Sequence, residues 1–130
     1  MVSPKKINLH IEDDARVAAA VACVLRDDGY HVITAYSAED GLRKVSKVHP
    51  DMLILDIGMP GMSGLTVLNQ LRGSSEKAAF PILIFTALPG VVDDAARASV
   101  DGLLVKPADG ETIVAEVERI LSLRAPQPVA

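Results

Sequence analysis

The stretch Met52-Leu-Ile-Leu-Asp56 joins four consecutive apolar residues to a single carboxylate. A strand that is covered on both faces, as in a parallel sheet, reads as an unbroken apolar run rather than as an alternation of apolar and polar residues. The run Ile82-Leu-Ile-Phe85 has the same character and leads into Thr86. The two stretches therefore predict strands of a parallel sheet, each of which ends beside a polar side chain.

Short apolar runs alternate with amphipathic stretches along the rest of the chain. Five runs are predicted as strands, at Ile7–Ile11, His31–Ala35, Met52–Leu55, Ile82–Phe85 and Gly102–Val105. Five helices are predicted after them, at Asp14–Asp28, Ser37–His49, Leu65–Arg72, Val92–Ala98 and Gly110–Leu123. Ser37 is the predicted N-cap of the second helix, because its hydroxyl group precedes the acidic Asp40 by three residues. The fourth helix is expected to be short, because Leu88-Pro-Gly90 delays its start. The alternation predicts an α/β fold with a doubly wound parallel sheet and helices on both faces.

Polar side chains follow four of the five predicted strands. The first strand leads into Glu12 and Asp13, and three later strands lead into Asp56, Thr86 and Lys106. The crevice of an open α/β sheet lies outside the carboxyl ends of its strands, so we expect these side chains to meet at one edge.

Three carboxylates that meet at one edge resist joint ionisation, and a hard divalent cation relieves their repulsion. Mg²⁺ prefers oxygen ligands and keeps several waters. Lys106 adds a compact positive charge and Thr86 a hydroxyl group, and together with a metal they suit the terminal oxygens of a phosphoryl group. Asp56 is the predicted acceptor because it stands alone after its strand, which leaves Glu12 and Asp13 to hold the metal.

The composition argues against several other classes of protein. The chain has 130 residues, of which 49% are hydrophobic, enough for one domain with a buried core. A net charge of −4 without a cluster of Lys or Arg argues against direct nucleic-acid binding. The single cysteine, Cys23, is expected to pack on a helix, and no stretch reads as a membrane span or signal peptide. We therefore expect a soluble cytoplasmic protein, with one domain at 1–125 and a short tail at 126–130 that carries no output domain.

Four sequence pieces resemble the receiver (CheY-like) domain of bacterial two-component response regulators, and they occur in the family's order and with similar spacing. The pieces are IEDD at Ile11–Asp14, LDIGMPGMSG at Leu55–Gly64, FTA at Phe85–Ala87 and LVKP at Leu104–Pro107. The resemblance covers the chain from about Lys6 to Leu123. It implies a flavodoxin-like sheet with the strand order 2-1-3-4-5.

The resemblance implies a function for the domain as a whole. A single-domain response regulator of this family takes a phosphoryl group from a histidine kinase or a histidine phosphotransfer protein onto Asp56. It then signals through phosphorylation-dependent contact with another protein, as a monomer or a weak dimer. Such a domain catalyses only its own phosphorylation and dephosphorylation, so it is not expected to be an enzyme acting on other substrates.

The resemblance also implies the ligands of the metal, which is Mg²⁺ or alternatively Mn²⁺. Asp13 resembles the direct ligand of the family, and Glu12 the acid that reaches the metal through water. Asp56 and the backbone carbonyl of Gly58 complete the predicted set.

Three further positions resemble the family's switch and positioning residues. Thr86 is similar to the hydroxyl residue that moves towards the phosphoryl group, and Lys106 to the lysine that pairs with it. Pro107 is similar to a proline that follows a cis peptide bond. The chain departs from the family at Leu103, where receivers usually carry Tyr or Phe, so the usual coupling of an aromatic side chain to the hydroxyl residue is not expected.

Other readings of the same residues remain open at this point. A phosphatase with an aspartyl-phosphate intermediate would carry a second acid two residues after its nucleophile, where this chain has Gly58. A receiver that is never phosphorylated, or a fragment of a longer regulator or hybrid kinase, are further alternatives. Asn8 and His10 are polar residues within the first predicted strand, and we expect them to lie at a sheet boundary or to bond to a neighbour.

Overall fold

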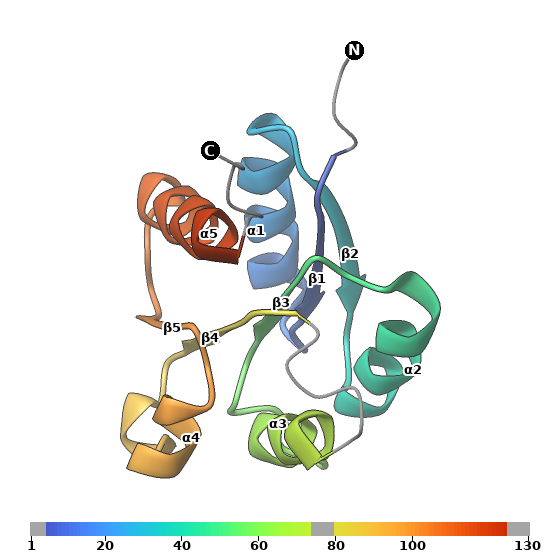
Figure 1. Cartoon of the computed structure of the whole chain (residues 1–130), viewed down its shortest axis with the longest axis vertical. Helices are drawn as coiled ribbons and strands as arrows, with labels where there is room; N and C mark the ends of the chain where they lie inside the picture. The colour runs from blue at the N-terminus through green and yellow to red at the C-terminus, as the bar shows by residue number, and fades with distance from the viewer. Residues whose placement is uncertain (1–4, 74–79, 125–130) are drawn as a thin grey trace, which may run out of the picture.

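The computed structural model describes residues 5–73 and 80–124. Its strands are β1 (Ile7–Ile11), β2 (His31–Ala35), β3 (Met52–Leu55), β4 (Ile82–Thr86) and β5 (Gly102–Val105). They form one parallel sheet in the order β2-β1-β3-β4-β5, which confirms the predicted fold class and strand order (Figure 1). β4 is one residue longer than predicted because Thr86 pairs with Val105. The carbonyl oxygen of Thr86 accepts a hydrogen bond from the Lys106 N–H at 2.8 Å.

The helices begin where a side chain satisfies free backbone N–H groups. They are α1 (Ala15–Asp27), α2 (Ala38–Val48), α3 (Gly64–Gly73), α4 (Asp94–Ala98) and α5 (Gly110–Arg124). Asp14 caps α1, since its Oδ1 accepts a hydrogen bond from the Arg16 N–H at 2.9 Å. Ser37 caps α2 in the same way, with its Oγ 3.1 Å from the Asp40 nitrogen. Asp14 stands just outside its helix, as N-caps do, rather than within it as predicted, whereas the predicted N-cap role of Ser37 is confirmed.

The predicted fourth helix, Val92–Ala98, begins two residues later than predicted, at Asp94, and a separate turn precedes it. A short 3₁₀ turn, η1, covers Pro89–Val91, and α4 starts only after Asp93, whose Oδ1 accepts a hydrogen bond from the Ala96 N–H at 2.8 Å. Proline fixes the backbone at the start of the turn and offers no N–H of its own. The expectation of a short fourth helix is therefore confirmed.

Two apolar layers cover the sheet. Helices α1 and α5 lie on one face, and α2, α3 and α4 lie on the other (Figure 1). Successive side chains of a strand point to opposite faces. On β1, Leu9 and Ile11 belong to the core beneath α2 and α3. Asn8 and His10 therefore point to the α1–α5 face.

The single cysteine lies on a helix, as predicted, but it is exposed rather than packed. Cys23 is exposed on α1, and the expectation that it packs against other residues is wrong. The buried stripe of α1 consists of Ala18, Val21, Ala22 and Leu25. This spacing already fills the face that meets the sheet, so Cys23 falls on the other side of the helix.

Within residues 5–73 and 80–124, no helix combines the length and the apolar character that a bilayer crossing needs. The predicted tail, 126–130, lies outside the described residues, and the domain boundary at residue 125 stays a prediction.

The first residue of α3 packs directly on the loop that follows β3. A Cβ atom added to Gly64 would lie 2.7 Å from the Cα of Ile57 and closer still to the carbonyl oxygen of Asp56. Both neighbours are backbone atoms, which cannot rotate away. We expect Gly64→Ala to lower the free energy of unfolding by about 1–3 kcal/mol, measured by urea unfolding followed by circular dichroism. Gly73→Ala is the matched control, since nothing lies within 4 Å of that position at the other end of α3; equal effects of the two substitutions would contradict the packing argument.

Candidate functional site

Three carboxylates meet at the carboxyl ends of the strands, where the sequence predicted a metal site. Glu12 and Asp13 follow β1, Asp56 follows β3, and each offers an oxygen within 4.8 Å of the other two. Glu12 and Asp56 are 0% and 6% exposed, whereas Asp13 faces solvent. The cluster is therefore buried on one side and open to an incoming ion or ligand on the other.

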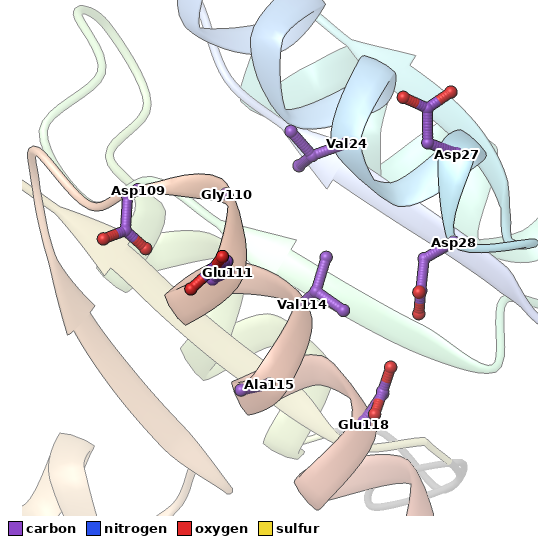
Figure 2. A pocket seen from close by; sticks show the side chains of 9 residues that line it. All are labelled: Val24, Asp27, Asp28, Asp109, Gly110, Glu111, Val114, Ala115 and Glu118. Carbon is purple, nitrogen blue, oxygen red and sulfur yellow. The ribbon is translucent and has the colours of Figure 1, made fainter.

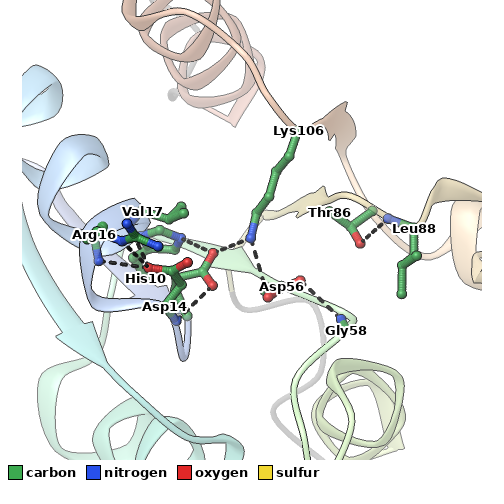
Figure 3. A network of polar contacts seen from close by, with 10 residues as sticks. His10, Asp14, Arg16, Val17, Asp56, Gly58, Thr86, Leu88 and Lys106 are labelled. Carbon is green, nitrogen blue, oxygen red and sulfur yellow. Dashed lines mark hydrogen bonds and ion pairs between the residues drawn. The ribbon is translucent and has the colours of Figure 1, made fainter.

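Lys106 lies between two of these carboxylates. Its Nζ is 2.5 Å from Oε1 of Glu12 and 3.4 Å from Oδ2 of Asp56 (Figure 3). The same ammonium lies 5.5 Å from the centroid of the Phe85 ring, within the range of a cation–π contact. The sequence predicted that Lys106 reaches the site, but not that it bridges the two carboxylates in this state.

Backbone N–H groups hold the other oxygen of each carboxylate. Oε2 of Glu12 accepts a hydrogen bond from the Asp14 N–H at 3.2 Å, and Oδ1 of Asp56 accepts one from the Gly58 N–H at 3.0 Å. Each carboxylate therefore has one oxygen on the backbone and one on Lys106. This arrangement fixes the orientation of both acids before any ligand arrives.

The proton affinities of the bridged groups follow from burial and from their contacts. Burial raises the pKa of Glu12 to about 7, and the hydrogen bond from Lys106 acts against that rise. Burial alone would lower the pKa of Lys106, but the hydrogen bond to Glu12 and the charge of Asp56 outweigh it and raise the pKa. With Nζ and Oε1 only 2.5 Å apart, we describe the pair near neutral pH as an ammonium and a carboxylate.

The predicted switch and positioning residues lie on β4, on β5 and just beyond. Thr86 is fully buried, and its Oγ1 accepts a hydrogen bond from the Leu88 N–H at 3.0 Å. The Lys106–Pro107 peptide bond is cis, which confirms the conformation that the resemblance implied. Leu103 is half-buried beside Ile84 of β4 and packs against the core beneath α2, α3 and α4.

A residue that the sequence did not single out covers part of the site. A Cβ atom added to Gly58 would lie 3.2 Å from Cδ1 of Leu88 and 3.8 Å from Oδ1 of Asp56. The side chain of Leu88 therefore lies over the place where most residues at position 58 would project. No pattern in the sequence predicts this contact, because it is made between the loop that follows β3 and the loop that follows β4.

His10 and Asn8 also differ from the prediction. Both are fully buried, and within the described part of the chain no side-chain nitrogen or oxygen of either residue has a hydrogen-bond partner. Nε2 of His10 is 3.9 Å from Oε1 of Glu12, which is too far for a hydrogen bond. Burial lowers the pKa of His10 to about 4, and the charge of Lys106 acts in the same direction. The expectation of a sheet boundary or a bonded neighbour is wrong for both residues.

A separate groove of about 770 Å³ lies between α1 and α5. Its lining includes the acidic side chains of Asp27, Asp28, Asp109, Glu111 and Glu118 (Figure 2). The carboxyl of Asp28 raises the pKa of Glu118 through a hydrogen bond and through its charge. None of the predicted site residues lines this groove, so it is not part of the site at the strand ends.

Comparison with known proteins identifies the class of protein. Residues 9–118 match the model of the response regulator receiver domain, and the chain belongs to this family. The two-component response regulator PhoP of Pseudomonas aeruginosa is 36% identical over 115 residues, which are 87% of this chain and 50% of that protein. The chain spans about half the length of the curated relatives it matches.

Two solved structures are similar in both fold and sequence. The chemotaxis protein CheY4 of Vibrio cholerae matches with a TM-score of 0.81 and 29% identity over 90% of this chain and 99% of that one. The response regulator protein TrrA of Thermotoga maritima, in complex with Mg²⁺ and BeF, matches with a TM-score of 0.80 and 29% identity. This match covers 88% of this chain and 98% of that one. The predicted membership of the receiver family is confirmed.

The burial of His10 predicts a pH dependence of stability. Because its pKa falls from the ordinary value of 6.5 to about 4 on folding, the unfolded chain binds a proton between these values that the folded protein rejects. The stability due to a neutral His10 is therefore present above pH 6.5 and is lost as the pH falls towards 4. We compare the free energy of unfolding of His10→Leu with that of the wild type. As the pH falls from about 7.5 to about 5, the difference should change in favour of the variant by about 2 kcal/mol.

Urea unfolding of both proteins with EDTA present measures this change. The raised pKa of Glu12 acts in the opposite direction, but it is common to the two proteins and cancels in their difference. A difference in unfolding free energy that stays constant across the range would contradict the account of His10.

Proposed function

We propose that the chain is a phospho-acceptor, in which Asp56 takes a phosphoryl group from a histidine kinase or a histidine phosphotransfer protein. The observation that carries this proposal is the bridge made by Lys106 between Glu12 and Asp56. One ammonium group lies between two oriented acids, at a site that Asp13 leaves open to solvent. Such an arrangement suits a negatively charged phosphoryl group that becomes covalently attached to Asp56.

The donor atoms suit Mg²⁺, and Mn²⁺ accepts the same set. Glu12, Asp13 and Asp56 offer only oxygen, within the 4.8 Å that lets one ion serve all three. The exposure of Asp13 leaves room for the waters that Mg²⁺ retains, and the backbone carbonyl of Gly58 is proposed as a further ligand. When bound, the ion would neutralise charge on the phosphoryl oxygens.

The transfer forms one bond and breaks one. An oxygen of the Asp56 carboxylate attacks the phosphorus of the donor's phosphohistidine, and the P–N bond breaks with its electron pair left on the imidazole nitrogen. The Gly58 N–H holds the carboxylate in place, so little reorientation is needed before attack. Lys106 then exchanges its carboxylate partners for a phosphoryl oxygen. The Thr86 hydroxyl, which accepts a hydrogen bond from the Leu88 N–H in this state, then donates one to a second phosphoryl oxygen.

Phosphorylation adds about −1.5 to −2 charges at one place on the surface, and we propose that a change in protein contacts reports it. The movement of Thr86 would be transmitted to β5 through Leu103. This side chain has no hydroxyl group, so the transmission would depend on packing and not on a change of hydrogen-bond partner. In this proposal the domain catalyses only its own modification. A hydrolase is disfavoured because Gly58 offers no second acid. A receiver that is never phosphorylated is disfavoured because the chain contains Asp56, Thr86 and Lys106, the residue types that phosphorylation would need.

The assignment of Asp56 is tested with acetyl phosphate and Mg²⁺, followed by intact mass. We expect the wild type to gain one phosphoryl group, and Asp56→Asn or addition of EDTA to abolish the gain. Asp27→Asn, which alters an exposed acid at the end of α1, is the matched control and should gain the group as the wild type does. A wild type that stays unmodified, both here and with phosphorylated histidine kinases, would favour the unphosphorylated alternative.

The role of Thr86 is tested by separating modification from response. We expect Thr86→Ala to reduce the amide shifts of β5 that Mg²⁺ and beryllofluoride induce far more than it reduces phosphorylation. The reason is that the methyl group of Ala cannot form a hydrogen bond to the bound anion. Thr86→Ser retains the hydroxyl group and should keep both. Shifts are measured by ¹H–¹⁵N correlation spectra, and phosphorylation by intact mass; an equal loss of both in Thr86→Ala would count against a conformational role.

A further inference from the structure

His10 is a buried polar side chain whose hydrogen-bonding capacity is unused in this state. It lies in β1, between Thr34 of β2 and Ile54 of β3, and is fully buried on the face that α1 and α5 cover. Neither ring nitrogen has a hydrogen-bond partner among the residues that the structure describes. Burying such a group without a partner costs free energy, so an apolar residue would be more favourable here if packing were its only role.

The ring is directed at an atom that already has a partner. Oε1 of Glu12 lies 2.5 Å from Nζ of Lys106 and 3.9 Å from Nε2 of His10 (Figure 3 draws both contacts). A movement of about 1 Å would bring the imidazole nitrogen within hydrogen-bond distance of that oxygen. An N–H group of His10 could therefore reach, after a small movement, an oxygen that Lys106 now holds.

The proposed phosphorylation removes that first partner. When Lys106 turns to the phosphoryl group on Asp56, Oε1 of Glu12 becomes a buried carboxylate oxygen without its donor. A neutral imidazole in the Nε2–H form offers one N–H, and carries no charge that would repel a metal ion. The N–H of His10, which has no partner in the resting state, thus matches Oε1 of Glu12, which phosphorylation would leave without a donor.

We propose that His10 is a positioning residue, which takes over the Glu12 carboxylate when Lys106 moves to the phosphoryl group. This inference rests on the proposed function of Asp56 and deepens it. Glu12 would then keep its orientation towards the metal through the exchange, held by the Asp14 N–H on one oxygen and by His10 on the other. The cost of burying the unpartnered ring is recovered only in the phosphorylated state, and this difference favours that state.

A matched pair of variants tests the reach of the donor. Gln places its amide nitrogen about where Nε2 of His10 lies, whereas Asn carries the same amide one methylene shorter. We measure the affinity for beryllofluoride in the presence of Mg²⁺ by calorimetry, with the full chain. His10→Asn should weaken the affinity about tenfold, the usual size of a lost contact to a metal-binding side chain, and His10→Gln should restore a value close to that of the wild type.

A spectroscopic measurement on the wild type does not depend on the folding of any variant. Long-range ¹H–¹⁵N spectra of the imidazole should show the Nε2 resonance shift to that of a hydrogen-bonded N–H when Mg²⁺ and beryllofluoride are added. An unchanged resonance would overturn the proposal, and so would His10→Gln and His10→Asn binding with equal affinity. If the wild type is not phosphorylated on Asp56 at all, the proposed function itself fails and this inference fails with it; if it is phosphorylated but the ring and the variants do not respond, only the role of His10 is lost.

Discussion

The mutual repulsion of Glu12, Asp13 and Asp56 is the constraint around which the site is built. Three carboxylate oxygens within 4.8 Å of one another can stay ionised only beside positive charge or N–H donors. In this state Lys106 supplies the charge, and the backbone N–H groups that follow Asp56 and Glu12 supply the donors. The sheet holds these groups rigidly, since β1, β3 and the close packing of α3 on the β3 loop leave them little freedom. The three carboxylates therefore form a set of oxygens that could hold a metal ion.

Much of this arrangement could be predicted from the sequence, because its causes are local. The unbroken apolar runs Met52–Leu55 and Ile82–Phe85 indicated strands covered on both faces. Parallel strands bring their carboxyl ends to one edge, so the acids and the lysine that follow them had to meet. The helix predicted from Asp14 begins one residue later, since a cap residue resembles the first residue of a helix in any pattern of polar and apolar positions. The N-cap at Ser37 could be predicted because the acidic Asp40 follows it by three residues.

The features that sequence reasoning missed depend on contacts between distant segments. The sequence predicts that Lys106 pairs with a phosphoryl group, but its partners in this state are Glu12 and Asp56, which only the folded sheet brings to it. The sequence predicts that His10 lies at a sheet boundary or bonds to a neighbour, because a buried polar side chain usually has a hydrogen-bond partner. Within the described residues its ring nitrogens have none. The cover that Leu88 forms over Gly58 joins two loops, and no periodicity reports such a contact.

If Lys106 and a bound divalent ion serve the same two carboxylates, removing the ammonium should make the protein depend more strongly on Mg²⁺ for its stability. The most direct measurement is the effect of Mg²⁺ on the melting temperature of Lys106→Met and of the wild type, at matched ionic strength. Without the ammonium, Glu12 and Asp56 are left as buried acids without compensating charge, so the variant should melt below the wild type in EDTA. Mg²⁺ should then raise its melting temperature by more than it raises that of the wild type, because the ion no longer competes with Lys106. An equal or smaller rise in the variant would contradict the account.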